Sequence, residues 1–211
     1  MPSCPLCTNP TTQHFHWDGQ RDYFRCPRCD LIAVPPAQRL APAAEKAIYD
    51  QHDNRPDDPG YRRFLGRLFE PLSERLPDGA SGLDFGAGPG PTLSLMFEEA
   101  GFSMRIHDPY YHPFPQWAEA EYDFITATEV AEHLYAPGEV LASLVQRLRP
   151  GGWLGLMTKR TPDDFAGWHY IRDPTHVVFF SDASFHWLAK RLGVTLELVG
   201  SDVALLQRPA R

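Results

Sequence analysis

A glycine-rich loop at residues 86–90 stands between a predicted strand and a predicted helix, and this order restricts the fold more than any other feature of the chain. The apolar run at 82–85 predicts the strand, and the segment 92–100 predicts the helix. A second predicted strand at 102–107 is followed by Asp108. Glycines let the backbone pass close beneath a ligand, and a helix N-terminus offers free N–H groups at the carboxyl end of a sheet. The segment therefore predicts a ligand-binding α/β unit.

Predicted strands and helices alternate through the rest of the chain. An amphipathic helix is predicted over 61–77, where apolar residues recur at intervals of three and four. The later elements are a strand at 122–126, a helix at 140–148, a turn at 150–152, a strand at 153–158, a helix at 181–191, and two adjacent strands at 195–200 and 203–208. This alternation predicts an α/β fold in which a mostly parallel sheet carries helices on both faces.

Asp108 follows the glycine loop at the spacing of a ribose-binding acid. It lies 20 residues beyond Gly88, where a carboxylate can accept hydrogen bonds from both ribose hydroxyls. A glycine pair alone is equally typical of a tight turn, but the complete order of strand, loop, helix, strand and acid favours nucleotide binding. The dinucleotide fingerprint requires glycine or alanine three residues after Gly88, where this chain has Pro91, and this disfavours NAD.

All four cysteines lie in the first 29 residues, as two C-x-x-C pairs with a short predicted hairpin at 15–26 between them. Each pair can direct two thiolates at one point, and two pairs form the tetrahedral sulfur cage that zinc prefers. We therefore expect a zinc ion bound by Cys4, Cys7, Cys26 and Cys29. Four sulfur ligands leave no open position for a substrate, so this zinc would be structural. The alternatives are two disulfides, which a cytosolic chain disfavours, and a redox pair, which normally occurs singly.

Four ordered segments resemble the motifs of class I S-adenosylmethionine-dependent methyltransferases, namely LDFGAGPG, the acid of HDPYY, YDFITATEVAEHL and LRPGGWLGLMT. The resemblance implies a Rossmann-like, seven-stranded sheet whose last two strands form an antiparallel hairpin. It also implies that Gly86, Ala87 and Gly88 approach the methionine part of S-adenosylmethionine, and that Asp108 holds the ribose. The cofactor residues assigned in this way are Asp84, Gly86, Ala87, Gly88, Gly90, Asp108, Thr128 and Glu129. Only residues 109–121 precede the next strand, which predicts a shortened sheet edge.

The cysteine segment is similar to the zinc-ribbon-like segment that some bacterial members of this class carry. The chain is thus expected to divide into a zinc-ribbon-like module at 1–32, a Pro/Ala-rich linker and cofactor-covering segment at 33–60, and a class I methyltransferase domain at 61–211. Within the middle segment we expect Tyr49 and His52 to close over the cofactor.

Residues 159–181 form a long predicted loop at the edge of the sheet where a methyl acceptor should lie. Long loops in compact domains are often functional lids. The polar and aromatic residues of this loop are Trp168, His169, Tyr170, Arg172, Asp173 and His176. The alternative for Trp168 and Tyr170 is that they only pack the loop against the domain.

The sequence E-x-x-E-H follows the third predicted strand. On a helical turn that begins at Glu129, Glu132 and His133 would lie on the same side and face the ligand crevice. The alternative is an ordinary helix N-terminus, which favours acids. The arrangement resembles that of small-RNA 2′-O-methyltransferases and of some quinone-biosynthesis O-methyltransferases. This resemblance implies a divalent cation at Glu129, Glu132 and His133, with His176 as a later ligand.

Two mechanisms are open at this turn. A divalent cation would lower the pKa of an attacking hydroxyl group. Without a metal ion, His133 or His176 would act as the general base. The candidate catalytic residues are therefore His133, His176, Glu132 and Glu129.

The charge balance restricts the class of partner. Acidic residues outnumber basic ones by 27 to 20, and the formal net charge of −7 argues against a broad nucleic-acid or membrane-binding surface. No apolar stretch of the sequence approaches the ~18 residues of a spanning helix, and the N-terminus lacks a signal-peptide pattern. We therefore expect a cytoplasmic protein without a membrane partner.

The predicted function is S-adenosylmethionine-dependent methylation of a small molecule, with an oxygen acceptor favoured. One alternative is an RNA methyltransferase that uses Arg21, Arg25 and Arg28 of the zinc module to bind the nucleic-acid backbone. The other is a non-catalytic cofactor-binding module.

Overall fold

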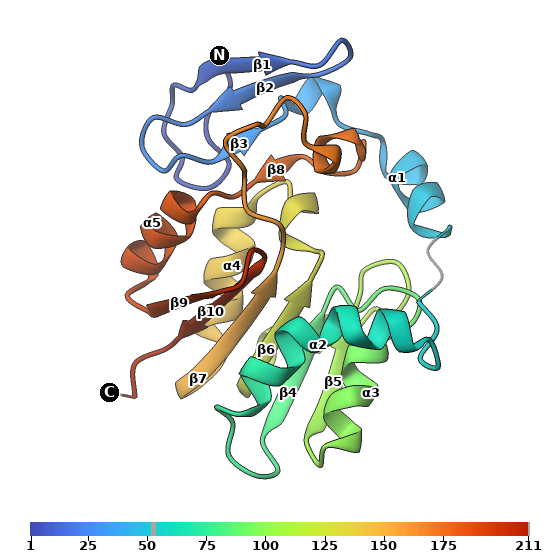
Figure 1. Ribbon diagram of the computed structural model, residues 1–211. Coiled ribbons are helices and arrows are strands. Elements are labelled where there is room, and N and C mark those ends of the chain that lie inside the picture. Colours follow the sequence, from blue (N-terminus) through green and yellow to red (C-terminus); the bar gives the residue numbers. More distant parts are fainter. Residues whose placement is uncertain (52–53, 211) are drawn as a thin grey trace.

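The computed structural model describes residues 1–51 and 54–210, so the predicted cofactor-covering residue His52 lies outside the described residues. Within those residues, the main sheet has six strands in the order β5-β4-β6-β7-β10-β9 (Figure 1). The strands are β4 (Ser81–Phe85), β5 (Ser103–His107), β6 (Tyr122–Thr128), β7 (Leu148–Met157), β9 (Thr195–Val199) and β10 (Val203–Gln207). The strands from β4 to β7 are parallel, whereas β10 is antiparallel to both β7 and β9. The predicted C-terminal hairpin is confirmed.

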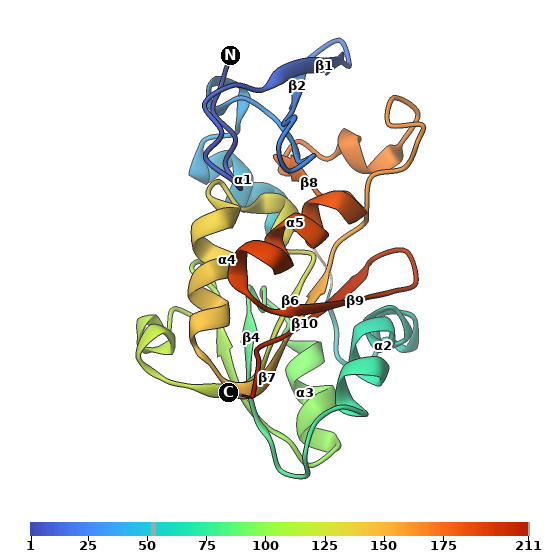
Figure 2. The ribbon, with the colours of Figure 1, turned by 90° about the vertical axis from the view of Figure 1, so that its left-hand side faces the viewer.

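Helices cover both faces of this sheet, as the alternation of elements predicts (Figure 2). They are α2 (Pro59–Ser73) and α3 (Thr92–Glu99) on one face, and α4 (Pro137–Gln146) and α5 (Asp182–Leu192) on the other. Leu68 of α2 lies in the buried cluster of Phe124, and Leu144 of α4 lies in that of Ile125. Phe124 and Ile125 are neighbours in β6, so their side chains point to opposite faces and both faces need a cover. In the described part of the chain, no helix combines the length and apolar character needed to cross a membrane.

The seventh strand that the resemblance implied is absent from the part of the chain that the structure describes. Residues 109–121 form a turn and the short 3-10 helix η2 (Pro115–Glu119). A parallel strand needs a crossover of about a dozen residues before it, and this segment is too short for both. β5 is therefore an edge of the sheet, which confirms the predicted shortening.

β7 begins before the position that the sequence suggested and contains the turn expected at 150–152. Gly151 has a φ of +81°, and the register between β6 and β7 shifts between Tyr122 and Phe124. Glycine adopts a left-handed conformation without strain, so the pairing of β7 with β6 continues past Gly151. The expected turn is therefore an irregularity inside a longer strand.

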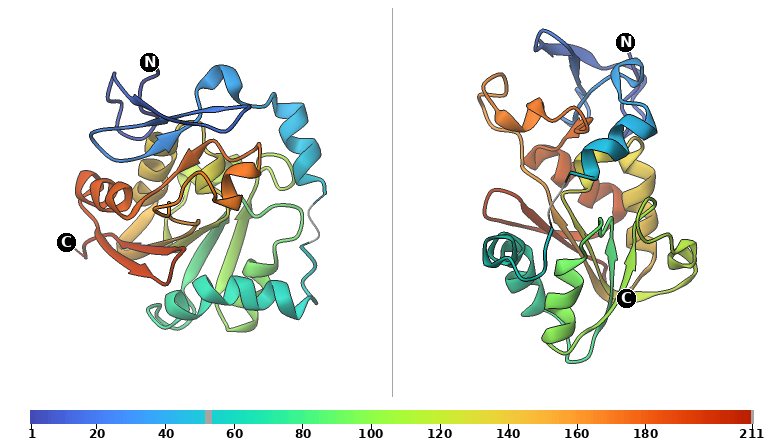
Figure 3. Two further views of the ribbon diagram at one scale, coloured as in Figure 1. Left: turned by 45° about the horizontal axis from the view of Figure 1, so that its top comes forward. Right: turned by 90° about the vertical axis from the view of Figure 1, so that its right-hand side faces the viewer.

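The cysteine segment, called the zinc module below after the ion that its four cysteines predict, forms a second, smaller sheet above the carboxyl end of the main sheet (Figures 1 and 3). Its strands are β1 (Gln13–Trp17), β2 (Asp22–Arg25), β3 (Ile32–Ala33) and, from the long loop, β8 (Val178–Phe179). The β1–β2 pair confirms the predicted hairpin. Tyr23 and Phe179 lie in the same buried cluster as Ile125 of the main sheet. The zinc module therefore shares the apolar core of the domain.

The segment predicted as a linker contains the 3-10 helix η1 (Pro36–Gln38) and the helix α1 (Pro42–Tyr49). Each begins with a proline, whose fixed φ and missing N–H suit the first helical position. The prolines that suggested a linker thus start helices, and α1 lies beside the small sheet on the way to α2 (Figure 3).

Candidate functional site

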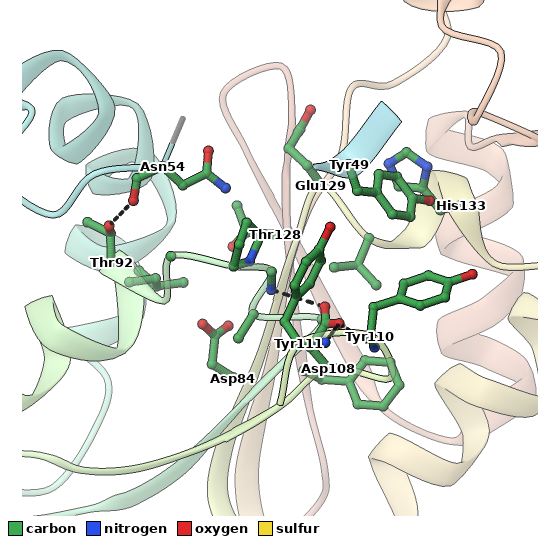
Figure 4. A pocket seen from close by; sticks show the side chains of 18 of the residues that line it. Tyr49, Asn54, Asp84, Thr92, Asp108, Tyr110, Tyr111, Thr128, Glu129 and His133 are labelled. Carbon is green, nitrogen blue, oxygen red and sulfur yellow. Dashed lines mark hydrogen bonds between the residues drawn. The ribbon is translucent and has the colours of Figure 1, made fainter. Parts of the chain in front are cut away.

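A cavity of about 690 Å³ opens at the carboxyl ends of β4, β5 and β6 (Figure 4). This is the edge of an α/β sheet at which ligands bind. The residues predicted to bind the cofactor all border it, namely Asp84, Gly86, Ala87, Gly88, Gly90, Asp108, Thr128 and Glu129. Of the candidate catalytic residues, Glu129, His133 and His176 border the cavity and Glu132 does not.

The glycine loop presents bare backbone to this cavity. Gly86 and Gly88 have φ values of +76° and +65°, which other residues rarely adopt. At Gly86 a Cβ would lie 2.5 Å from Val130 Cγ2, and at Gly90 it would lie 2.4 Å from the carbonyl oxygen of Asn54. Side chains are therefore excluded at both positions. A Cβ at Gly88 would meet nothing nearer than Asn54 Nδ2 at 3.7 Å, so this position has open space around it.

Asp108 is 7% exposed, and both of its carboxylate oxygens accept backbone hydrogen bonds. Oδ2 accepts from the N–H of Gly88 at 3.0 Å. Oδ1 accepts from the N–H groups of Tyr110 at 2.8 Å and Tyr111 at 3.0 Å. These bonds hold the carboxylate against the glycine loop (Figure 4). Each carboxylate oxygen has two lone pairs, so Oδ2, which accepts one of these bonds, can still accept from a ligand hydroxyl, whereas Oδ1 already accepts two.

Asp84, at the end of β4, is engaged inside the protein although it borders the cavity. Its carboxylate accepts hydrogen bonds from the hydroxyl groups of Thr126 at 2.8 Å and Ser94 at 3.2 Å. Burial raises the pKa of Asp84 to about 6 in spite of these bonds.

We expect Asp84→Asn to change the pH dependence of stability. The pKa of Asp84 is higher in the folded protein than in the unfolded chain, so protonated Asp84 favours the folded state. This contribution to the free energy of unfolding is fully present below the pKa of Asp84 in the unfolded chain and is lost as pH rises through about 6. Asparagine has no charge to bury, so the free energy of unfolding of the variant should rise relative to wild type by about 3 kcal/mol between about pH 4 and about pH 7. Denaturant unfolding at several pH values measures this, with the exposed Asp163→Asn as control. A difference that stays constant with pH would contradict the expectation.

The turn after β6 is not the helical turn that the sequence suggested. Glu129 has a left-handed backbone with a φ of +52°, and the 3-10 turn η3 (Ala131–His133) follows it. Glu129 borders the cavity, whereas Glu132 is 0% exposed. The expectation that Glu132 faces the crevice is therefore wrong, because a left-handed residue and a three-residue turn replace the spacing of an α-helix.

Tyr170 links the two glutamates. Its hydroxyl donates a hydrogen bond to Glu132 and lies 3.3 Å from Glu129 Oε2. Burial raises the pKa of both Glu129 and Glu132, and the nearby carboxylate of Glu132 raises that of Glu129 further. Among the residues that the structure describes, Glu129 Oε1 and Glu132 Oε2 are buried without a hydrogen-bond partner. Such orphan oxygens indicate a site that a bound group completes.

The other side chains of the long loop divide into packing and surface residues. The ring centroid of Trp168 lies 4.9 Å from that of Tyr170 and 5.9 Å from that of Phe179, so the packing alternative is confirmed for Trp168. His169 and Arg172 are exposed and lie outside the cavity lining.

His133 and His176 come together at the cavity, with ring centroids 4.8 Å apart. His133 Nδ1 lies 3.1 Å from the carbonyl oxygen of Thr175, and His176 Nδ1 lies 2.8 Å from that of Tyr170. A carbonyl oxygen can only accept, so Nδ1 of each ring carries the proton and Nε2 keeps its lone pair. Burial lowers the pKa of both rings, and the neighbouring His133 lowers that of His176 further. Both imidazoles are therefore neutral near neutral pH.

The structure brings together three of the four residues predicted for a second metal site. One ligand atom from each of Glu132, His133 and His176 lies within 4.8 Å of the others, while Glu129 is outside this group. Two imidazoles oriented by carbonyl groups, together with an unpartnered carboxylate oxygen, form a donor set suited to a divalent cation.

Helix α1 closes the cavity opposite the glycine loop. The ring centroid of Tyr49 lies 5.3 Å from that of His133, so Tyr49 is placed as expected. Glu45 of the same helix is 7% exposed and accepts a hydrogen bond from the hydroxyl of Tyr110 at 3.0 Å. Neither Glu45 nor Tyr110 was predicted, because no local pattern marks a contact between residues 65 positions apart.

The four cysteines converge at one point of the zinc module. The Sγ atoms of Cys4 and Cys29 are 3.5 Å apart, as are those of Cys7 and Cys26, and all four thiols are free. A disulfide requires about 2 Å, so the disulfide alternative is contradicted. The four sulfur atoms lie within 4.8 Å of one another, and a hydrogen bond from Cys29 lowers the pKa of Cys4. This arrangement fits the tetrahedral thiolate cage of a metal ion.

Comparison with known proteins identifies related sequences and folds. A family model described as a methyltransferase domain matches residues 58–199. No curated protein matches the chain.

Two solved structures from Burkholderia thailandensis have a similar fold. One is an O-methyltransferase family protein, with a TM-score of 0.53 and 13% identity, covering 79% of this chain and 60% of that protein. This chain thus spans less than two thirds of that relative. The other is 1,6-didemethyltoxoflavin-N1-methyltransferase with bound 1,6-didemethyltoxoflavin and S-adenosylhomocysteine, with a TM-score of 0.53 and 19% identity, covering 93% of this chain and 99% of that one. Identities this low establish similarity of fold alone.

Proposed function

The chain belongs to the methyltransferase domain family, and on that premise we propose that it transfers the methyl group of S-adenosylmethionine to an oxygen atom of a small molecule. One observation carries the proposal. The bare glycine loop and Asp108 border the same cavity as a pair of neutral histidines. The similar Burkholderia protein solved with S-adenosylhomocysteine supports this choice of cofactor.

The cavity residues have the properties that the cofactor requires. S-adenosylmethionine would supply the methyl group on a sulfonium, so the protein needs mainly to align the reacting atoms. Gly86 and Gly88 would admit the methionine part close to the backbone, and Asp108 would accept hydrogen bonds from the ribose. Among the described residues, Thr128 Oγ1 and Glu129 Oε1 lack a partner and are available to a ligand.

We expect Asp108→Ala to weaken binding of S-adenosylmethionine by about 1.5–3 kcal/mol, the scale of losing hydrogen bonds to a charged group. Isothermal titration calorimetry on the full chain measures the change. Asp108→Asn preserves the shape of the side chain but sets an NH2 group against a backbone N–H, so it should also weaken binding, while the exposed Asp163→Ala should bind as wild type does. Equal affinities for wild type and Asp108→Ala would place the cofactor elsewhere.

The histidine pair supports an oxygen acceptor. A hydroxyl group must lose its proton as it is methylated, and the free Nε2 of His133 or His176 can take it. Asp173 Oδ2 lies 3.7 Å from His176 Nε2, so its charge would stabilise the imidazolium that forms.

A divalent cation is the second mechanism, and the residues fit it. Glu132, His133 and His176 would hold the ion, which would lower the pKa of the acceptor hydroxyl. We place the base mechanism first, because Glu132 is engaged by Tyr170 and does not border the cavity. Chelation followed by addition of Mg²⁺ or Mn²⁺, with the cysteine site kept occupied, separates the two. The base mechanism predicts that methyl transfer survives chelation.

For the cysteine cluster we propose a structural zinc, which would fold a segment of about 30 residues that is too short for a core of its own. Two of the three arginines considered for RNA binding are engaged within the protein. Arg21 donates to backbone carbonyls of the long loop, and Arg25 pairs with Asp30 at 2.6 Å. This favours a small-molecule acceptor over RNA.

Incubation with S-adenosylmethionine and panels of phenols, catechols and hydroxy acids tests the proposed function. Release of S-adenosylhomocysteine above the acceptor-free rate, with a methyl ether or ester as product, is the expected result. Methylation only of amines, or only of RNA, would overturn the assignment of a small oxygen acceptor.

A further inference from the structure

Arg21, beside the turn of the β1–β2 hairpin, donates hydrogen bonds to four backbone carbonyls of one loop. Its Nη1 bonds the carbonyl oxygens of Pro174 at 3.1 Å and His176 at 3.0 Å. Its Nη2 bonds those of Ile171 at 2.5 Å and Asp173 at 3.1 Å. The segment from Ile171 to His176, called the acceptor loop below, therefore curls around a single guanidinium group.

Arg21 is itself held in place by the hairpin turn. Asp18 Oδ1 accepts hydrogen bonds from the N–H groups of Gln20 at 2.8 Å and Arg21 at 2.7 Å, and Gly19 has a φ of +98°. The hydroxyl of Tyr23 donates to Asp18 Oδ2 at 2.6 Å. The guanidinium group thus projects from a turn whose own conformation is fixed by hydrogen bonds.

The acceptor loop connects this contact to the cavity. Asp173 and His176 border the cavity, while their backbone carbonyls bond to Arg21. The carbonyl of Thr175, in the same loop, accepts the hydrogen bond from His133 Nδ1 at 3.1 Å. The conformation of the loop therefore sets the direction of both imidazole rings.

Only arginine can make this contact. Four carbonyl oxygens approach two terminal nitrogens of one planar group, which carries five N–H donors in a fixed fork. Lysine has three donors on one nitrogen and cannot donate to all four carbonyls. A neutral side chain such as methionine donates to none, which leaves Ile171 with only the Tyr23 hydroxyl, Asp173 with only the N–H of His176, and the other two carbonyls without the bonds that Arg21 makes.

We propose that Arg21 is a positioning residue, which holds the acceptor loop so that His133 and His176 keep Nε2 directed at the methyl acceptor. The significance of this role for catalysis rests on the proposed function, whereas the contact itself does not. The zinc module then shapes the acceptor side of the cavity and leaves the cofactor side to the glycine loop and Asp108.

Arg21→Met in the full, zinc-containing chain tests the proposal. Nitrogen-15 NMR of the histidine rings reports which ring nitrogen carries the proton. In wild type, His133 and His176 should each show a single Nδ1–H form, and in the variant both should become mixtures of tautomers. Amide hydrogen exchange across 171–177 should rise by about tenfold or more. The Kd for S-adenosylmethionine should stay within about twofold, because no residue of the acceptor loop is among those assigned to the cofactor.

Arg28→Met removes the same charge from an exposed position of the zinc module and should change none of these readouts. The histidine tautomers and exchange rates of Arg21→Lys should fall between those of wild type and Arg21→Met. If the methionine variant loses zinc or fails to fold, Arg21→Lys alone tests the role of Arg21. Wild-type tautomers and exchange rates in both Arg21 variants would overturn the proposal. If wild type itself failed to bind S-adenosylmethionine, the proposed function would fall, while the NMR and exchange data would still decide the role of Arg21.

Discussion

Cys26→Ser should release zinc from the zinc module and lower the stability of the whole chain. Cys26 is 1% exposed and lies in one buried cluster with Tyr23, Phe179 and Ile125, so the zinc module and the domain share a core. Structural zinc sites contribute about 10–16 kcal/mol of apparent binding free energy in small zinc-finger peptides. Loss of even a third of this should lower Tm by about 10 °C in a domain of this size.

Elemental analysis and a thermal melt of the same preparation measure both effects of Cys26→Ser. Thr11→Ser changes an exposed residue of the same module and serves as the control. A Cys26→Ser protein with one zinc per chain and an unchanged Tm would contradict the structural role of the metal ion.

His133→Ala and His176→Ala should each reduce methyl transfer by about 10²–10⁴-fold, the usual range for loss of a general base. Binding of S-adenosylmethionine should persist, because the glycine loop and Asp108 are unchanged. The two rings are 4.8 Å apart and depend on one loop. The rate of methyl transfer in the double variant should therefore be only slightly lower than in the less active of the two single variants.

The rate of S-adenosylhomocysteine release, with an acceptor found in the screen, measures the effect of the histidine variants. His186→Ala, an exposed histidine of α5, is the matched control and should retain the wild-type rate. Full activity in both His133→Ala and His176→Ala would exclude the histidine base. If Glu132→Ala were fully active as well, the cation site would also be excluded.

The cofactor side of the cavity could be predicted because its residues are local in sequence. The glycine loop, the helix after it and Asp108 follow one another within a single β-α-β unit, and their spacing alone places them at one sheet edge. Six of the eight residues assigned to the cofactor belong to this unit, while Thr128 and Glu129 come from the end of β6 and were assigned through the family resemblance; all eight border one cavity. The cysteine pairs were predictable for the same reason, since each C-x-x-C forms its own local turn.

The acceptor side could not be predicted in detail, because it is built from distant contacts. Arg21 bonds the carbonyl of Ile171 across 150 positions, and Tyr170 bonds Glu132 across 38. The left-handed Glu129 has no signal in the sequence, since the residue is not glycine. The left-handed residue directs Glu132 into the core. A helical turn, as the sequence suggested, would have placed Glu132 at the crevice.

Calorimetric titration of the full chain with S-adenosylmethionine, repeated with NAD and with Gly88→Val, tests the central claim most directly. We predict one S-adenosylmethionine bound per chain and no binding of NAD. Gly88→Val should abolish binding of S-adenosylmethionine, because a branched side chain at a φ of +65° would strain the loop and fill the space beside Asp108. Binding of NAD in place of S-adenosylmethionine, or undiminished affinity in Gly88→Val, would contradict the assignment of this cavity to a methyl donor.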